Sequence, residues 1–474
     1  MAPLDSGDTE RWAAAAAWSR RTHLDPVETV LWRAERHPVQ SATTCLLIDL
    51  DREPDWERFV SATDWGVHLV RRLRQRVLDP ALPTAPPVWV DDPHFSLTYH
   101  VRRRTLGGDG TRADLLDAAA QFALRPFDRT RPLWEGVLFT GLEGGGAAYV
   151  LKIHHTLADG LGTVELLSLL QSRTRRHTSD KPTAPTPSAG LSPDSRSLAT
   201  DGMVRDLVLM PERATAVARS LVSAAFSPRT ATAQAMRYAA SARRLVATPP
   251  AAPSPLMAAR SGHEWHLLTL SAEREAMRAA GRGVGGSLQD VFVAVLAGGL
   301  GRYHELHGEP VEELPVAIRV SLDRADDPMS GNRFAGAMIA APVGLEDAGD
   351  RIAAVRGEVL SLHTETALGA FRALAPLAAR LPSDVVSGLL QLGSAADASV
   401  ATIPGPTKAA FMAGAQVTGM YPFAPLPGVA IAATLLTLGD TVCLGFNVDA
   451  EAVPDLDVLE ECLQRSLDEV LAAG

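Results

Sequence analysis

Residues 148–170 of this 474-residue chain read AYVLKIHHTLADGLGTVELLSLL. The first part is apolar and typical of a buried strand, and it leads directly into His154 and His155. A leucine-rich segment with helical spacing follows Gly160. The pattern HHxxxDG should arise by chance on the order of 10⁻³ times in a chain of this composition. It therefore indicates a site, and the flanking segments place that site at a turn between a strand and a helix.

The residue types in this motif suit proton transfer. Neutral imidazole has a pKa of about 6.5, so it can act as a general base at cellular pH. Neighbouring side chains on an extended segment point to opposite sides, so one histidine can face a cavity while the other packs inside. Asp159 can fold back onto the turn or bind a distant arginine, and either contact would hold the reactive histidine in place. Gly160 would allow a tight turn with positive φ.

Three other interpretations of the motif stay open. The first is a metal site, although zinc-binding helices place two histidines one helical turn apart with a glutamate between them, unlike this motif. The second is a Ser-His-Asp hydrolase, although the chain has no GxSxG elbow. The third is a pair of structural histidines whose hydrogen bonds are satisfied in the core.

Composition and charge narrow the class of function. Lys and Arg number 45 against 55 Asp and Glu, and the net charge of -10 argues against a nucleic-acid partner. Cys45, Cys443 and Cys462 form neither a disulfide framework nor a CxxC metal site, which fits a reducing cytosol. The first residues lack the basic start of a signal peptide, and no apolar run reaches the roughly 20 residues that cross a bilayer. We expect a cytoplasmic protein, with peripheral membrane attachment left open.

Two proline-rich breaks divide the chain. Residues 178–200 are rich in Pro, Ser, Thr and Ala, which predicts a flexible linker, and residues 248–255 contain four prolines. The expected domains are an N-terminal lobe with the motif (1–175), the linker with connector helices (176–255) and a C-terminal lobe (256–474). The stretch between the two breaks looks helical and rich in arginine, and it could either lie on lipid headgroups or connect the lobes in solvent.

Strand and helix patterns mix in both lobes, without the regular alternation of a doubly wound parallel sheet. This predicts a mixed α/β fold, and no glycine-rich loop suggests a bound dinucleotide or phosphate. Apolar and β-branched runs predict strands at residues 44–50, 148–153, 265–270, 315–320 and 336–343. Helical spacing predicts helices at residues 111–123, 162–170, 287–303 and 455–472.

The motif also resembles that of a known superfamily. HHxxxDG is typical of acyltransferases related to chloramphenicol acetyltransferase, of carnitine acyltransferases and of the condensation domains of peptide synthetases. Residues 131–135 read RPLWE, about twenty residues before the motif, and resemble the PLW motif of the bacterial wax ester synthase/diacylglycerol acyltransferase (WS/DGAT) family. Further stretches resemble that family in order along the chain, namely residues 24–26, 87–89, 92–95, 100–103, 287–291, 331–332, 404–406, 421–422 and 453–455.

The chain departs from the family pattern in its C-terminal half. Gln289-Asp290 stands where the family reads Asn-Asp, and Thr402 lies in the stretch where an Asn usually precedes Pro-Gly-Pro. The strand after Tyr-Pro is polar in typical members, but residues 429–436 are apolar here. The family uses this half to shape its substrate channel, so the resemblance supports the type of reaction more than the substrate.

The resemblance implies two chloramphenicol-acetyltransferase-like lobes with a substrate tunnel between them. His155 would take the proton from an acceptor hydroxyl, which would attack an acyl thioester directly, without an acyl-enzyme. His154, Asp159 and Gly160 would support that histidine structurally. The resemblance also implies acyl-CoA or an acyl carrier protein thioester as co-substrate, with no metal and no permanently bound cofactor. The substrate-channel candidates are Pro132, Trp134, Gln289, Asp290 and Asn332.

Several of these candidates have structural alternatives. Trp134 could be a core aromatic, and Asp290 and Asn332 could support a helix start or a turn, where Asp and Asn are common. Their roles stay open between substrate contact and support of the fold.

Three functions follow as hypotheses. The first is an acyl-CoA-dependent O-acyltransferase acting on a long-chain alcohol or diacylglycerol, with loose attachment to a membrane or lipid droplet. The second is a specialised-metabolite acyltransferase that esterifies or amidates a non-lipid acceptor, with a donor carried by an acyl carrier protein. The third is a scaffold protein without activity, which the intact His155 and Asp159 disfavour.

Overall fold

The computed structural model describes most of the chain outside its middle part. The described residues are 6–18, 21–35, 40–82, 85–176, 183, 195–198, 200, 251–321, 334–363, 375, 378–381, 383–386 and 396–474. Asn332, the stretch between the two proline-rich breaks and most of the expected linker lie outside these residues.

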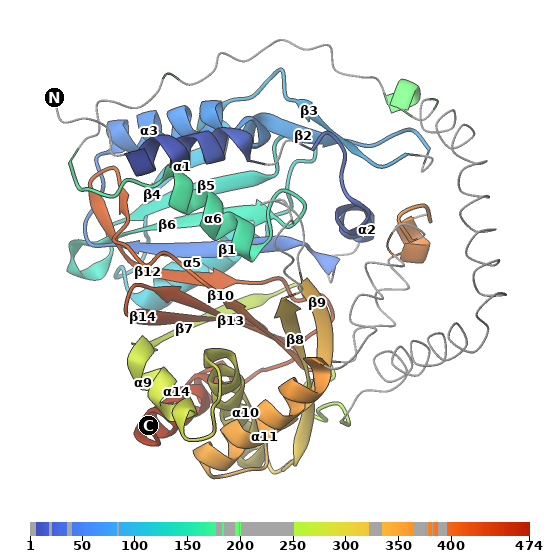
Figure 1. Ribbon diagram of the computed structural model, residues 1–474, viewed down its shortest axis with the longest axis vertical. Helices are drawn as coiled ribbons and strands as arrows, with labels where there is room; N and C mark the ends of the chain where they lie inside the picture. The colour runs from blue at the N-terminus through green and yellow to red at the C-terminus, as the bar shows by residue number, and fades with distance from the viewer. Residues whose placement is uncertain are drawn as a thin grey trace.

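Two six-stranded sheets organise the described residues (Figure 1). The first contains, in spatial order, β11 (Phe411–Met412), β12 (Ala415–Phe423), β1 (Thr43–Leu50), β6 (Ala147–His154), β5 (Trp134–Thr140) and β4 (Val101–Thr105). The second contains β7 (Trp265–Glu273), β14 (Thr441–Asp449), β13 (Ile431–Leu438), β10 (Ala398–Ile403), β8 (Glu313–Ser321) and β9 (Phe334–Pro342). A small two-stranded sheet pairs β2 (Gln75–Leu78) with β3 (Val88–Asp91).

Both large sheets mix strand directions. β4 and β5 are parallel, as are β10 and each of its neighbours β8 and β13, whereas the remaining pairs in the two sheets are antiparallel. A doubly wound fold would have mostly parallel strands with helices between them. The predicted mixed α/β class is therefore confirmed.

Helices cover the sheets in separate layers. Packed on the outer face of the first sheet are α1 (Ser6–Ala17), α3 (Trp56–Leu69) and α6 (Gly160–Leu170). Between the two sheets lies α5 (Arg112–Leu124), whose apolar face meets Phe423 and Leu267. The outer face of the second sheet is covered by α9 (Arg274–Arg282), α10 (Leu288–Leu306), α11 (Ala348–His363) and α14 (Leu456–Ala472). The short helices α2 (Pro26–Ala34) and α4 (Leu97–His100) complete the first lobe.

Local sequence explains where key helices begin. Capping boxes start α2, α5 and α10. In each, the side chain of the N-cap residue accepts a hydrogen bond from the backbone N–H three residues later, and the side chain of that later residue accepts one from the N-cap N–H. The interior of α10 is apolar on all sides because it is covered by α11, α14 and β9. Gly301 permits that packing, since a Cβ at this position would lie 2.1 Å from the carbonyl oxygen of Val343.

The C-terminal third of the chain also contributes to the first sheet. β12 pairs antiparallel with β1 and places Tyr421 opposite Leu47. The chain thus passes from β10 in the second sheet to β11 and β12 in the first, and then back to β13 in the second. Among the described residues, no helix combines the length and the apolar character needed to span a bilayer.

The predicted elements correspond to observed ones. The strand expected at 148–153 is β6, and the helix expected at 162–170 is α6, which begins two residues earlier. The other expected strands correspond to β1, β7, β8 and β9, and the other expected helices to α5, α10 and α14. The sequence patterns gave no indication of β5, although it lies beside the motif strand.

Candidate active site

The HHxxxDG motif begins at the last residue of β6, a central strand of the first sheet. The N–H of His154 donates to the carbonyl of Leu133 across 3.0 Å, and the N–H of His155 donates to the carbonyl of Ala42 across 2.8 Å. The PLW segment and the motif, separated in sequence, are therefore joined by backbone hydrogen bonds. The backbone of both histidines is fixed from two sides, by the segments that precede β5 and β1.

His154 is held on both ring nitrogens. Its side chain is 0% exposed, and its Nε2 lies 2.8 Å from Oε2 of Glu35. The backbone N–H of Thr156 donates to Nδ1 across 3.1 Å, so Nδ1 accepts and the ring proton lies on Nε2, where it is donated to Glu35. Trp32 and Phe127 contact the ring edge-on. This arrangement suits a support for the turn and leaves neither nitrogen to a substrate.

Glu35 is a member of the site that the sequence patterns did not indicate. It directly follows α2, and its carboxylate also accepts from Arg129 across 2.9 Å and from the N–H of Ala42 across 3.0 Å. Burial alone would raise the pKa of Glu35, but the interactions with His154, Ala42 and Arg129 outweigh burial and lower it to about 2. Glu35 is therefore an ionised anchor for His154.

Asp159 folds back onto the turn, one of the two contacts expected for it. Its Oδ1 accepts from the N–H of Gly162 across 2.7 Å, which makes it the N-cap of α6. Its carbonyl accepts from both the N–H and the hydroxyl of Thr163 across 2.8 Å. Asp159 and His155 are buried, with 3% and 7% of their surface exposed. The cap fixes the start of α6 directly after the motif.

The expected role of Gly160 needs a correction. Gly160 is not among the glycines of positive φ and is instead the first residue of α6. The reason for glycine is space, because a Cβ here would lie 2.7 Å from Cδ1 of Ile403. Ile403 ends β10, directly before the Pro-Gly-Pro segment. The motif turn therefore contacts the second sheet, so the candidate site lies at the boundary between the two lobes.

Trp134 of the PLW segment has a structural position and also lines a cavity. Its Nε1–H donates to the carbonyl of Leu73 across 2.8 Å, and its ring stacks on His100 with centroids 4.7 Å apart. Pro132 is buried, and its carbonyl accepts from the N–H of Trp134. Trp134 pairs with Ile153, the residue just before the two motif histidines.

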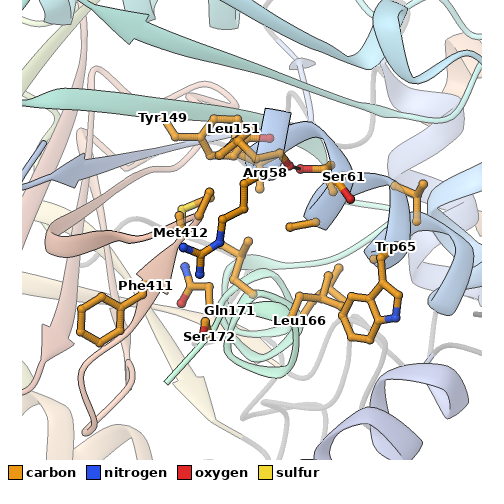
Figure 2. A pocket seen from close by; sticks show the side chains of 18 of the residues that line it. Arg58, Ser61, Trp65, Tyr149, Leu151, Leu166, Gln171, Ser172, Phe411 and Met412 are labelled. Atoms are coloured by element: carbon orange, nitrogen blue, oxygen red, sulfur yellow. Dashed lines mark hydrogen bonds between the residues drawn. The ribbon is translucent and has the colours of Figure 1, made fainter. Parts of the chain in front are cut away.

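A cavity of about 690 Å³ extends along α6 in the first lobe (Figure 2). Its walls come from α3, β5, β6, α6 and the segment around β11, and many of them are apolar. Trp134, Ile153 and Thr163, which flank the motif in space, belong to this lining, whereas Gln171 and Arg58 contribute polar groups. Such a volume falls in the usual range for small-molecule sites, which is about 300–1,000 Å³.

Gln289 and Asp290 lie in the second lobe, at the start of α10. Asp290 completes the capping box of α10, where its Oδ2 accepts from the N–H of Ser287 across 2.7 Å, and Arg356 lies nearby. Gln289 is the second residue of that helix. As a whole α10 packs against the outer face of the second sheet, away from β6 (Figure 1). Asn332 lies outside the described residues.

The described residues give no support to the metal or hydrolase interpretations. No group of three or more His, Cys, Asp or Glu in the described ranges could hold a metal ion. Ser254 and His304 do contact each other, with Oγ and Nε2 separated by 2.7 Å. Both are buried, however, and the Ser254 hydroxyl accepts from two backbone N–H groups of the loop that follows. That contact organises a loop.

Comparisons with protein families match both parts of the chain. The model described as the wax ester synthase/diacylglycerol acyltransferase catalytic domain matches residues 24–292. The model described as the WS/DGAT C-terminal domain matches residues 330–470.

Individual relatives match over nearly the whole length. In Mycobacterium tuberculosis (strain H37Rv), the protein named "Putative diacyglycerol O-acyltransferase Rv2484c" is 33% identical over 95% of this chain and 91% of its own. Among solved structures, the wax ester synthase/diacylglycerol acyltransferase from Marinobacter aquaeolei VT8 is 21% identical and superposes with a TM-score of 0.64, over 96% of this chain and all of its own.

More distant structures share the fold. The first condensation domain of the calcium-dependent antibiotic synthetase is 16% identical and superposes with a TM-score of 0.60, over 96% of this chain and 97% of its own. These neighbours have the two-lobed fold related to chloramphenicol acetyltransferase, as the motif implied. With two family models and a relative matching over nearly its whole length, the chain belongs to the wax ester synthase/diacylglycerol acyltransferase family and is an acyltransferase.

Proposed function

We propose that this acyltransferase moves an acyl group from acyl-CoA to the hydroxyl of a long-chain alcohol or diacylglycerol, with His155 as the general base. Family membership supplies the coarser part, an acyl donor and a hydroxyl acceptor. The observation that carries the finer part is the largely apolar cavity, whose lining includes Ile153 and Thr163 on either side of His155 in sequence. The motif residues His154, His155 and Asp159 do not line the cavity themselves, so a chain bound there would contact Ile153 and Thr163, which adjoin the motif.

In the proposed reaction, His155 accepts the proton of the acceptor hydroxyl as its oxygen attacks the thioester carbonyl. The tetrahedral intermediate collapses, the carbon–sulfur bond breaks, and the imidazolium returns the proton to the leaving thiolate. The products are an ester and free CoA, and no acyl-enzyme forms. A positioned general base contributes roughly 10²–10⁴-fold to such a step, and holding both substrates in one site contributes further.

His154 and Asp159 have supporting roles in this proposal. His154 is engaged by Glu35 and Thr156, and Asp159 caps α6. Both contacts fix the backbone on either side of His155. The reacting imidazole would therefore be oriented before substrate arrives, which lowers the cost of reaching the transition state.

A specialised-metabolite acceptor with a donor on an acyl carrier protein is the second candidate function. The observations that favour it are the departures from the family pattern at Gln289 and Thr402 and the apolar character of β13. These changes lie in the lobe that shapes the substrate channel in the family.

A thioester-consumption assay tests the proposal. The purified protein is given palmitoyl-CoA with hexadecanol or a diacylglycerol, and release of free thiol is measured beside His155→Ala. Thiol release that needs the lipid acceptor and falls by at least 10²-fold in His155→Ala supports the proposal. A folded His155→Ala variant with full activity contradicts the general-base role.

The same preparation separates the two candidates. If protein that is folded by circular dichroism releases no thiol with either lipid acceptor, the proposed lipid acceptor is contradicted and the carrier-bound donor is favoured. Flotation with phospholipid vesicles then tests the proposed peripheral attachment to a membrane or lipid droplet. Protein that stays at the bottom of the gradient contradicts that attachment.

A further inference from the structure

Gln171 is a buried polar residue that lines the cavity beside Arg58 and Ser172. It follows α6 directly, and its N–H donates to the carbonyl of Leu167 across 2.8 Å. Its side chain is 5% exposed, and within the described ranges neither Oε1 nor Nε2 has a hydrogen-bond partner. A buried polar group without partners destabilises the fold, so native proteins rarely keep one unless it serves a purpose.

The described neighbours of Gln171 in the cavity lining do not satisfy its carboxamide. Leu166, Leu170 and Met412 line the same cavity and offer it no polar atom. Arg58 also lines the cavity, but it donates to the backbone carbonyls of Arg175 and Arg176 across 3.1 and 3.0 Å. In Figure 2 the carboxamide extends from the end of α6 toward the Arg58 guanidinium.

Ser172, the next residue, differs from Gln171 in this respect. Its hydroxyl donates to the carbonyl of Thr174 across 2.8 Å, and its backbone pairs with Phe411. The local fold thus satisfies Ser172 and leaves the Gln171 carboxamide without a hydrogen-bond partner among the described residues. Ser172 is therefore a matched control for Gln171.

We propose that Gln171 determines specificity by selecting a chain that carries an oxygen substituent, a hydroxyl or an oxo group, over an unsubstituted chain. The inference rests on the proposed function, because the chain in this cavity would belong to the acyl donor or to the acceptor. A carboxamide both donates and accepts, as does a hydroxyl, and the neighbouring guanidinium would favour an oxygen. Either substrate could supply the chain, and the chemistry recognised is the same.

The length of α6 places the substituent along the chain. Thr163 lies in the first turns, beside the motif, and Gln171 lies just past the last turn. At a rise of about 1.5 Å per residue the two are separated by roughly 12 Å along the helix axis. The oxygen would therefore lie well away from the reacting end, in the middle of a long chain.

Binding measurements test this inference independently of turnover. In the donor arm, stearoyl-CoA is compared with a mid-chain hydroxystearoyl-CoA by calorimetric titration of the full chain. In the acceptor arm, octadecanol is compared with the diol that has its second hydroxyl in mid-chain. We expect the hydroxylated chain to bind about tenfold tighter or better in one arm, and that arm identifies which substrate occupies the cavity.

Variants then assign the preference to the side chain. In Gln171→Leu and Gln171→Met the preference should disappear and the unsubstituted chain should bind more tightly, whereas Ser172→Ala should keep the wild-type ratio. Two apolar replacements are used, so that the test can still be made with one variant if the other does not fold. If Gln171 only stabilised the fold, its replacement would not change the ratio of the affinities for the hydroxylated and the unsubstituted chain.

Three outcomes overturn the inference. They are equal affinity for both chains in both arms, a preference that persists in the folded apolar variants, and no binding of any chain. Failure of the proposed function would appear separately, as absence of thiol release with every acceptor in the assay above. Transfer of unsubstituted chains by both wild type and Gln171→Leu at equal rates would leave the proposed function standing without this selectivity.

Discussion

Nε2 of His154 and the carboxylate of Glu35 lie 2.8 Å apart, although the two residues are 119 positions apart in sequence. Through this contact, the end of α2 anchors the strand that presents His155. Trp32 of the same helix packs against the His154 ring, and Arg129 stacks over Trp32 while pairing with Glu35. The support of the motif therefore extends to α2, outside the motif and the PLW segment.

Replacing Glu35 should destabilise the fold around the motif. Glu35→Ala leaves the buried His154 Nε2–H without its acceptor, so we expect a loss of about 1–3 kcal/mol in the free energy of unfolding, measured by urea denaturation. Glu35→Gln keeps an accepting oxygen and should lose less. Equal stability of wild type and Glu35→Ala would show that the contact contributes nothing.

His100 should make the protein sensitive to mild acid. Its ring is 0% exposed and lies between Phe95 and Trp134, and burial lowers its pKa from 6.5 to about 4. Between pH 6.5 and 4 the unfolded chain binds a proton at His100 that the folded chain does not. The free energy of unfolding is therefore unaffected by the titration of His100 above pH 6.5 and decreases as the pH falls toward 4. The full loss is on the order of 3 kcal/mol.

His100→Asn isolates this effect. The Asn amide can replace the Nδ1–H that donates to the carbonyl of Trp134, but it does not titrate. Asp92, Arg131 and Glu135, whose charges act on His100, are the same in both proteins. The difference in unfolding free energy between the two should therefore shrink or reverse as the pH is lowered from 7 to 4, and a constant difference would refute the assignment.

Local patterns in the sequence were enough to predict the motif strand, its helix and the class of the fold. A continuous apolar run marks β6, which is buried on both faces, and helical spacing marks α6, which packs one face on the core. The family pattern added the type of reaction. The edges of elements and strands with weaker patterns, such as β5, needed the tertiary structure.

The contacts that complete the site could not be predicted in this way. Glu35 is one acidic residue among many, and only the packing of α2 brings it to His154. In the sequence, Gln171 is an ordinary residue at the end of a leucine-rich helix. The lack of a hydrogen-bond partner for its side chain among the described residues depends on neighbours from α3 and β11. The predicted reason for glycine at position 160 was wrong, because the residue does not have a positive φ. Glycine is needed there because a side chain would collide with Ile403, which is distant in sequence.

The contact between Gly160 and Ile403 should appear as coupling between two substitutions. Gly160→Ala puts a methyl carbon 2.7 Å from Cδ1 of Ile403, closer than van der Waals contact, so we expect a loss of about 1 kcal/mol in stability and reduced acyl transfer from a shifted motif turn. Ile403→Val removes Cδ1 and should make Gly160→Ala tolerable. A double-mutant cycle on unfolding free energy and thiol release measures this. Strictly additive effects would mean that the turn and β10 are not coupled.

Asp159 offers a way to separate capping from charge. Asp159→Ala removes the acceptor for the N–H of Gly162 and should cost about 0.5–2 kcal/mol of stability, with a loss of acyl transfer because α6 no longer begins rigidly behind His155. Asp159→Ser keeps an N-cap oxygen but removes the carboxylate charge. If capping is the role, the Ser variant should recover most of the stability and most of the thiol release. Recovery of stability without recovery of activity would instead show that the motif needs the charge of Asp159, which the capping geometry alone does not explain.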